Sequence, residues 1–249
     1  MQPSLTLIYL CLNEQQALPR TLDEALDFCR NSLKDWEIIV VDDGSTDQSA
    51  AIVQKYAQEE PRVRLCQHPR NLGMGAGLRT GITASRKDYF CMLAADGQIP
   101  AAELAKMLPH LSPEMGSPPQ PASDASPSIV LTTYSNRPNN AVRTLISRGF
   151  RLYMRALVGV DFALEGTYLF PTAVARDEIG LNTLVSNTFF FSFELLIRAK
   201  RLGHRTVNCQ IASLPRQDGG GSRVANLKQI KRVAAEVLKL HHQLDRERL

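Results

Sequence analysis

The sequence predicts an α/β fold in which a mostly parallel sheet is flanked by helices. Two observations carry this prediction. In the N-terminal half, short apolar runs alternate with longer segments of helical periodicity, and most of these runs end abruptly in polar residues. A chain that alternates strand and helix makes right-handed crossovers, and such crossovers place the strands parallel to one another in one sheet.

Four apolar runs of the N-terminal half are expected to form strands. The clearest is Ile38–Val41, in which four consecutive residues are β-branched. A run of this kind without helical period is typical of a strand buried on both faces. The other three runs are Leu5–Leu12, Asp88–Ala95 and the weaker Val63–Gln67, and a further strand is expected at Ser128–Thr133.

Helices are expected where apolar residues recur at helical spacing. They are predicted at Ala17–Leu33, at Gln48–Ala57, from near Gly75 onward, at Ala141–Val158, from Phe189 through Ala199 and at Val224–Leu244. The last is a C-terminal amphipathic helix whose polar side carries lysines and an arginine. We expect its apolar side to pack against the rest of the chain, with a dimer contact or a membrane surface as alternatives.

Acidic residues follow three of the predicted strands. Asn13-Glu14 follows the first strand, Asp42-Asp43 the second, and Asp96 follows Asp88–Ala95. The carboxyl ends of parallel strands meet at one edge of the sheet, where ligands of open α/β sheets bind. After Asp43, Gly44 permits a tight turn, and Ser45 or Thr46 would cap the next helix, whose positive N-terminus suits Asp47. An Asx-type turn with a helix cap is the alternative interpretation of this motif.

A glycine-rich segment follows the third predicted strand. Gly73, Gly75 and Gly77 alternate, and Gly81 follows four residues later. This spacing is neither the dinucleotide fingerprint nor a P-loop, which needs Gly-Lys-Ser or Gly-Lys-Thr. The segment therefore gives little support to NAD binding, and the alternative to a ligand role is a turn that begins a helix.

Four motifs taken together resemble a family 2 glycosyltransferase with the Rossmann-like GT-A fold. They are LNE at 12–14, VDDGSTD at 41–47, NLGMGAGLRTG at 71–81 and ADGQ at 95–98. Two later segments are similar to the polyprenol-phosphate branch, which includes dolichol-phosphate mannosyltransferases. These are DFALEGTYLF at 161–170, similar to an acceptor-site segment, and FELLIRAKRLGHRTVNCQIASLPR at 193–216 followed by GGGSR.

The resemblance implies a nucleotide-sugar site at the sheet edge. Glu14 would lie near the ribose or base, Asp42 and Asp43 would read base and ribose, and Arg79 would contact the diphosphate. The full set of implied donor contacts is Leu12, Asn13, Glu14, Asp42, Asp43, Gly73, Gly75, Arg79, Ala95, Asp96 and Gly97.

The resemblance also implies a divalent cation, Mg²⁺ or Mn²⁺. Asp96 matches the last carboxylate of the family's DxD motif, and Gln98 matches a residue that completes the cation's shell. Ala94 stands where the motif has its first carboxylate. Mg²⁺ keeps several waters and uses substrate phosphates, so one carboxylate can serve it. Two hypotheses follow: an active enzyme with a looser metal site, or a catalytically impaired nucleotide-sugar-binding subunit.

Arginines mark the expected acceptor side. Between Ala125 and Val160 the chain has five arginines and no acidic residue, and a surface of one sign suits a phosphate-bearing acceptor or an anionic bilayer. In that branch a basic residue follows the aromatic residue of the acceptor-site segment. Tyr168-Leu169-Phe170 lacks this basic residue, and Arg143 and Arg148 would take its place. The expected acceptor and phosphate contacts are Arg143, Arg148, Arg216, Ser222 and Arg223, and Arg216 is expected to act in catalysis with Asp96.

The predicted reaction is sugar transfer with inversion from a nucleotide-sugar to a polyprenyl phosphate. Such an acceptor is already anionic and needs no strong general base. A hydroxyl acceptor is the alternative, and it would need Asp161 or Glu165 as its base. A nucleotidyltransferase is disfavoured because no glycine-rich, lysine-containing loop follows the first strand. Nucleic acid is not an expected partner, because the net charge is only +4 and no recognition motif is present.

The expected organisation is a nucleotide-sugar-binding half at 1–111, a Pro/Ser-rich loop at 112–128, an acceptor half at 129–223 and the helix at 224–249. The loop is expected to be an inert insertion, with a lid that orders on donor binding as the alternative. Within the acceptor half, Phe189–Phe193 is expected to be helix core rather than a groove for a lipid tail. Glu194 follows in the same apolar stretch, so we expect a structural pairing, for example with an arginine.

The composition is that of an ordinary globular chain, with 44% hydrophobic and 22% charged residues. Five scattered cysteines without a C-x-x-C motif indicate reduced core residues. No leader and no membrane-spanning run is evident. We therefore expect a cytoplasmic protein, peripheral on the inner face of the membrane if its acceptor is a lipid.

Overall fold

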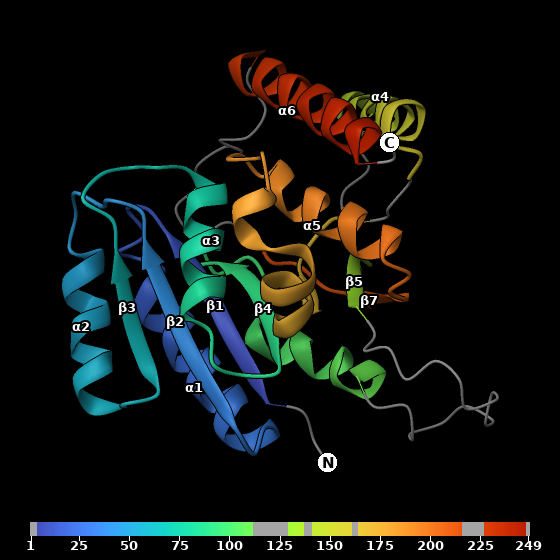
Figure 1. Cartoon of the computed structure of the whole chain (residues 1–249). Coiled ribbons are helices and arrows are strands. Elements are labelled where there is room, and N and C mark those ends of the chain that lie inside the picture. The colour runs from blue at the N-terminus through green and yellow to red at the C-terminus, as the bar shows by residue number, and fades with distance from the viewer. Residues whose placement is uncertain (1–3, 112–128, 137–140, 161–163, 216–226, 248–249) are drawn as a thin grey trace.

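One seven-stranded sheet organises the chain, with strand order β3-β2-β1-β4-β6-β5-β7. The computed structural model describes residues 4–111, 129–136, 141–160, 164–215 and 227–247 (Figure 1). Strands β1, β2, β3 and β4 pair in parallel, and β5 pairs in parallel with β7. Only β6 runs antiparallel to its neighbours among the described strands. The expected mostly parallel α/β sheet is therefore confirmed.

The strand bounds agree closely with the sequence pattern in the N-terminal half. The strands are β1 Leu5–Cys11, β2 Trp36–Asp42, β3 Val63–Gln67, β4 Tyr89–Ala94, β5 Ile129–Tyr134, β6 Tyr168–Pro171 and β7 Thr206–Ile211. Two of them, β6 and β7, are not apparent from the sequence. Strand β6 has only four residues, and β7 is an edge strand with one fully buried residue, so neither shows a clear period.

The helices are α1 Leu18–Ser32, α2 Ser49–Glu59, α3 Met74–Ala84, α4 Ala141–Val158, α5 Phe190–Arg201 and α6 Leu227–Arg246. Shorter helical segments are η1 Ala101–Lys106, η2 Leu108–Leu111, η3 Val174–Ile179 and η4 Leu181–Thr183. The predicted C-terminal amphipathic helix is present as α6. None of the described helices combines the length and the apolar character needed to cross a membrane.

Two apolar cores cover the two faces of the sheet. Successive side chains of β2 point to opposite faces of the sheet. Ile38 and Val40 belong to a first core on one face, and Ile39 and Val41 belong to a second core on the other. The first core includes residues of α1 and η1, and the second includes residues of α3, α4, α5 and α6. Strand β2 is thus buried on both faces, as its continuous apolar run predicts.

The phenylalanine run at the start of α5 is core, as expected. Phe190 and Phe191 are fully buried, and Phe193 meets Phe150 of α4 edge-to-face, with ring centroids 5.4 Å apart. Helices α4 and α6 lie side by side above α5 (Figure 1). The run therefore joins the sheet to the α4–α6 pair.

The five cysteines are free thiols, but only three of them are core residues. Cys66 and Cys209 are partly exposed, because β3 is an edge strand and β7 closes the opposite edge. The expectation that all five lie in the core is wrong for these two. The Pro/Ser-rich stretch 112–128 lies outside the described residues.

Candidate functional site

The carboxyl ends of β1, β2 and β4 meet at one edge of the sheet, as expected. In the strand register, Cys11 lies beside Asp42 and Leu10 beside Ala94. The backbone N–H of Asp43 donates to Cys11 O at 2.9 Å, and that of Ala95 donates to Leu10 O at 3.0 Å. The segments 12–14, 42–47 and 95–98 therefore emerge next to one another.

The loops after β1 and β2 are fastened together through Asn13. Its backbone adopts a positive φ of 55°, which Asn tolerates better than most residues. Its Oδ1 accepts from the Thr46 amide at 2.8 Å, and its own amide donates to Ser45 Oγ at 2.9 Å. Helix α2 begins only at Ser49 and has no side-chain cap from Ser45 or Thr46. That part of the prediction is wrong, because both residues bond the β1 loop instead.

Asp47 and Ser49 also link the loop after β1 to the start of α2. Asp47 Oδ1 accepts from the Ser49 amide at 2.9 Å, and Ser49 Oγ accepts from the Glu14 amide at 3.0 Å. Partial burial raises the pKa of Asp47, but hydrogen bonds from Ser49 and Gln15 outweigh it, and the net pKa is lowered. Asp47 is therefore anionic at the start of α2, where the helix dipole favours a negative charge.

Asp42 and Asp43 are buried, and their carboxylates bond the protein itself. Asp42 accepts from the Ser45 amide at 3.0 Å and from Gln67 Nε2 at 3.2 Å. Asp43 accepts from the amides of Leu72 and Gly73, both at 2.9 Å. The pair thus holds both the turn after β2 and the start of the glycine-rich segment. Any contact with base or ribose would share oxygens that already accept these bonds.

His68 belongs to this site, although no sequence motif points to it. Its Nδ1 lies 2.7 Å from Asp43 Oδ1, and its Nε2 lies 2.9 Å from Thr80 Oγ1 on α3. An ionised carboxylate can only accept, so Nδ1 is the donor to Asp43, and Nε2 faces the Thr80 hydroxyl, which can both donate and accept. Its position directly after β3, at the same sheet edge, is the signal that would have found it.

A cleft of about 390 Å³ opens at the carboxyl ends of β2 and β3. Its volume falls in the range of small-molecule sites, roughly 300–1,000 Å³. It is lined by Gly44, Ser45, Thr46, Gln67, His68 and Pro69. A larger hollow of about 520 Å³ lies between α1 and η1, and none of the predicted site residues lines it. The cleft at the ends of β2 and β3 is the candidate ligand site, because it adjoins the buried Asp42 and Asp43.

Gly44 cannot be replaced without strain, and Gly44→Ala is expected to destabilise the fold markedly. Gly44 has φ +78°, and an added Cβ would lie 2.4 Å from the backbone carbon of Arg70. The positive φ alone costs about 1–2 kcal/mol. Gly203→Ala is the matched control, because Gly203 has φ +90° with nothing within 4 Å of an added Cβ. Thermal unfolding should show the larger loss for Gly44→Ala, and equal losses would contradict the close packing against Arg70.

The turn after β4 carries the expected metal residues. Asp96 is buried, and its Oδ1 accepts from the Gln98 amide at 3.1 Å. Ala95 is buried, Ala94 is exposed, and Gly97 has a positive φ of 69°. Among the described residues, no group of three or more His, Cys, Asp or Glu side chains could hold a metal ion. The side-chain oxygens of Asp96 and Gln98 suit Mg²⁺ or Mn²⁺ only as part of a shell completed by water and a bound diphosphate.

The glycine-rich start of α3 packs closely against the segment before α5. An added Cβ on Gly75 would lie 2.6 Å from the backbone of Asn187, and one on Gly73 would lie 3.1 Å from its carbonyl oxygen. The Gly75 amide donates to Asn187 O at 3.1 Å. Packing alone therefore requires glycine at 75. No sequence signal points to Asn187, which is far away along the chain.

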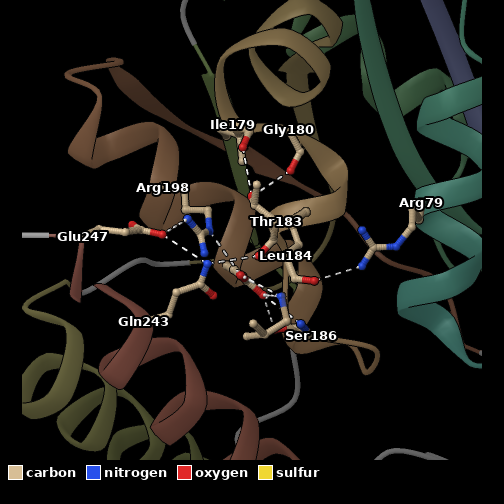
Figure 2. A network of polar contacts seen from close by, with 11 residues as sticks. Arg79, Ile179, Gly180, Thr183, Leu184, Ser186, Arg198, Gln243 and Glu247 are labelled. Atoms are coloured by element: carbon tan, nitrogen blue, oxygen red, sulfur yellow. Dashed lines mark hydrogen bonds and ion pairs between the residues drawn. The ribbon is translucent and has the colours of Figure 1, made fainter. Parts of the chain in front are cut away.

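Arg79 turns toward the same segment. Its Nη2 donates to Leu184 O at 3.3 Å (Figure 2), and its guanidinium lies 5.2 Å from the ring centroid of Phe191. Partial burial lowers the pKa of Arg79, which the nearby Glu194 carboxylate partly offsets. In this structure Arg79 joins α3 to α5, so its expected contact with a diphosphate stays a prediction.

The expected acceptor residues are only partly described. Arg148 is exposed on α4, together with Arg151 and Arg155. Glu165 Oε2 accepts from the Tyr134 amide at 3.2 Å. The residues Arg216, Ser222, Arg223 and Asp161, and the side chain of Arg143, lie outside the described residues.

The described chain before residue 216 runs beside the Asp96 turn. The Leu214 amide donates to Gln98 O at 2.8 Å. Ala212 is held nearby through its amide, which donates to Glu103 Oε2 at 2.6 Å. The end of β7 is thereby fixed against the segment that follows β4.

Comparison with known proteins identifies relatives of this chain. Residues 6–117 match the family model of glycosyl transferase family 2. The human dolichyl-phosphate beta-glucosyltransferase is 32% identical over 79% of this chain and 63% of its own length. The undecaprenyl-phosphate 4-deoxy-4-formamido-L-arabinose transferase of Pectobacterium atrosepticum is 29% identical over 63% of this chain and 45% of its own. The chain therefore spans less than two thirds of these relatives.

A solved structure agrees over nearly the whole chain. Glucosyl-3-phosphoglycerate synthase of Mycobacterium tuberculosis, in complex with Mn²⁺, UDP-glucose and phosphoglyceric acid, superposes with a TM-score of 0.65 at 18% identity, covering 96% of this chain and 80% of that one. This likeness supports the GT-A fold that the motifs imply. The segment that carries Asp42, Asp43 and Asp96 is therefore similar to glycosyl transferase family 2 over residues 6–117.

Proposed function

We propose that the chain transfers a hexosyl group, with inversion, from a nucleotide-sugar to a polyprenyl phosphate. The observation that carries the proposal is the sheet edge. The cleft beside Asp42 and Asp43 opens there, and the Asp96 turn follows β4 at the same edge, in a segment that matches glycosyl transferase family 2. Relatives named for dolichyl-phosphate and undecaprenyl-phosphate acceptors support the acceptor class.

In the proposed reaction, a phosphate oxygen of the acceptor attacks the anomeric carbon of the sugar. The bond from that carbon to the donor diphosphate breaks, and the nucleoside diphosphate leaves with the bonding electrons. The acceptor oxygen is already anionic, so no side chain has to remove a proton. The chain's task is to orient donor and acceptor and to stabilise the charge that develops on the leaving group.

Asp96 and Gln98 would hold the divalent cation that this chemistry uses. When bound, Mg²⁺ or Mn²⁺ supplies positive charge at the leaving diphosphate. Because Ala94 contributes no ligand, affinity for the free cation is expected to be weak and to rise with donor bound. A synthase of similar fold was solved with both Mn²⁺ and UDP-glucose bound, which supports a cation beside the donor.

The experiment that tests the function has two steps. Calorimetry with UDP- and GDP-sugars, with and without Mn²⁺, identifies the donor and its metal dependence. The best donor, radiolabelled in the sugar, is then offered to a short polyprenyl phosphate and to the dephosphorylated polyprenol. Product on the phosphate alone supports the proposal. Transfer only to the hydroxyl would favour a glycosyltransferase with a hydroxyl acceptor, and donor binding without any transfer would favour an impaired binding subunit.

A membrane-facing surface follows from this proposal, and α4 offers one. Arg148, Arg151 and Arg155 are exposed there beside Leu152, which is 70% exposed. An anionic lipid surface attracts each such arginine by about 1 kcal/mol. Apolar side chains between the basic ones can enter the interface.

Replacing all three arginines by glutamine should weaken binding to anionic vesicles by about a hundredfold. Co-sedimentation with phosphatidylglycerol vesicles measures it, and neutral phosphatidylcholine vesicles serve as reference. The triple variant Lys34→Gln, Lys55→Gln, Arg86→Gln is the matched control, because it removes the same charge from exposed positions elsewhere. Equal losses in both triple variants would show that net charge, and not α4, governs the attraction.

A further inference from the structure

The segment Leu184–Thr188, here called the strap, lies between the donor half of the chain and the C-terminal helix. Its first anchor is Glu194 of α5, a carboxylate with 0% exposure. Glu194 accepts from the amides of Val185 and Ser186 and from Ser186 Oγ at 3.1, 2.9 and 2.5 Å. The buried carboxylate therefore fixes the backbone of the first part of the strap.

The second anchor is Glu236 of α6, which is 8% exposed. Its Oε1 accepts from the Asn187 amide at 3.0 Å, and its Oε2 accepts from Thr188 Oγ1 at 2.6 Å. Tyr153 of α4 donates to Ala234 O on α6 at 3.2 Å. The last part of the strap is thus held by the α4–α6 pair, which also carries the exposed arginines.

The strap in turn holds α3. Leu184 O accepts from Arg79, and Asn187 O accepts from the Gly75 amide at 3.1 Å (Figure 2 shows the Arg79 contact). The residues before Gly75 are held from the other side, since the Leu72 and Gly73 amides donate to Asp43. The start of α3 is therefore bonded on one side to Asp43 at the sheet edge and on the other side to Asn187 of the strap.

We propose that Glu236 is a positioning residue that couples α6 to the donor site through the strap. The chain of contacts is Glu236 to Asn187, Asn187 to Gly75, and the Gly75 turn to Asp43. Glu236 and Gly75 are buried at the two ends of the Asn187 link, whereas Asn187 is an exposed residue that takes part through its backbone N–H and C=O. The position of α6 thereby fixes the position of the glycine-rich residues 72–77. That the donor binds against these residues rests on the proposed function.

Amide hydrogen exchange in residues 72–77 tests the coupling without any ligand. In Glu236→Ala, the Asn187 amide loses its acceptor, and exchange at 72–77 should quicken by at least about tenfold. Glu236→Gln should stay close to wild type, because its amide oxygen can accept from Asn187 and its NH₂ can donate to Thr188 Oγ1. Val237→Ala is the matched control, a buried neighbour on the same helix without a polar atom.

Unchanged exchange in Glu236→Ala, or equal quickening in Val237→Ala, would overturn the proposal. If Glu236→Ala does not fold, Glu236→Asp takes its place, because its shorter side chain cannot reach both strap partners. The UDP- and GDP-sugar panel adds a second readout, with donor affinity expected to fall about tenfold in Glu236→Ala, as expected for one or two lost hydrogen bonds. If wild type binds no nucleotide-sugar, the proposed function fails, and the exchange data still decide the coupling.

Discussion

Asp96→Asn should lower kcat/KM for sugar transfer by about 10²–10³-fold, the loss typical when one group that stabilises transition-state charge is removed. Asn retains an oxygen that can accept from the Gln98 amide, so the turn after β4 is expected to persist. What is lost is the negative charge, and with it the affinity for a divalent cation at the diphosphate. Transfer assays over a range of Mn²⁺ concentrations measure both effects.

The companion variant is Ala94→Asp, which restores the family's first carboxylate. Ala94 is exposed, so a charged side chain there avoids the cost of burial. We expect tighter binding of Mn²⁺ in the absence of donor, and a lower Mn²⁺ concentration for half-maximal activity. Wild-type turnover in Asp96→Asn at every Mn²⁺ concentration would rule out the metal-assisted mechanism. Turnover that appears only in Ala94→Asp would identify the natural chain as an impaired subunit.

Glu194→Ala should lower the free energy of unfolding by about 3–5 kcal/mol, the cost of leaving a buried charge without its partner. Arg198 is 8% exposed, and its Nε donates to Glu194 Oε1 at 3.2 Å. Its Nη1 bonds Glu247 at 3.2 Å (Figure 2), and none of the described residues accepts a hydrogen bond from its buried Nη2. Removing Glu194 would also leave the strap amides of Val185 and Ser186 without an acceptor.

Thermal unfolding measures this loss, which corresponds to a drop of roughly 10 °C for a chain of this size. Asp245→Asn is the control, because Asp245 is exposed and lies 3.4 Å from His241 in a surface ion pair. Such pairs contribute about 0–1 kcal/mol. A loss in Glu194→Ala no larger than in Asp245→Asn would contradict the structural role of the buried carboxylate. The result also confirms or rejects the strap's first anchor, independently of any ligand.

The arginine partner of Glu194 illustrates how local sequence can predict a tertiary feature. A carboxylate within an apolar helical stretch must be paired, and Arg198 lies one helical turn later in the sequence. The expected structural pairing is confirmed for this reason. The strap amides that also bond Glu194 come from outside the helix, and nothing in the helical pattern indicates them.

The sequence by itself determined the parallel sheet, its polar carboxyl edge and the resemblance to family 2 glycosyltransferases. Apolar runs such as Ile38–Val41 report burial on both faces directly, and the acids after them must gather at one edge. Only the tertiary structure decided what those acids contact. Asp43 bonds the glycine-rich turn and His68, and Gly75 is required by the backbone of Asn187. The physical reason is that these contacts join residues far apart in the chain, and local periodicity carries no information about such partners.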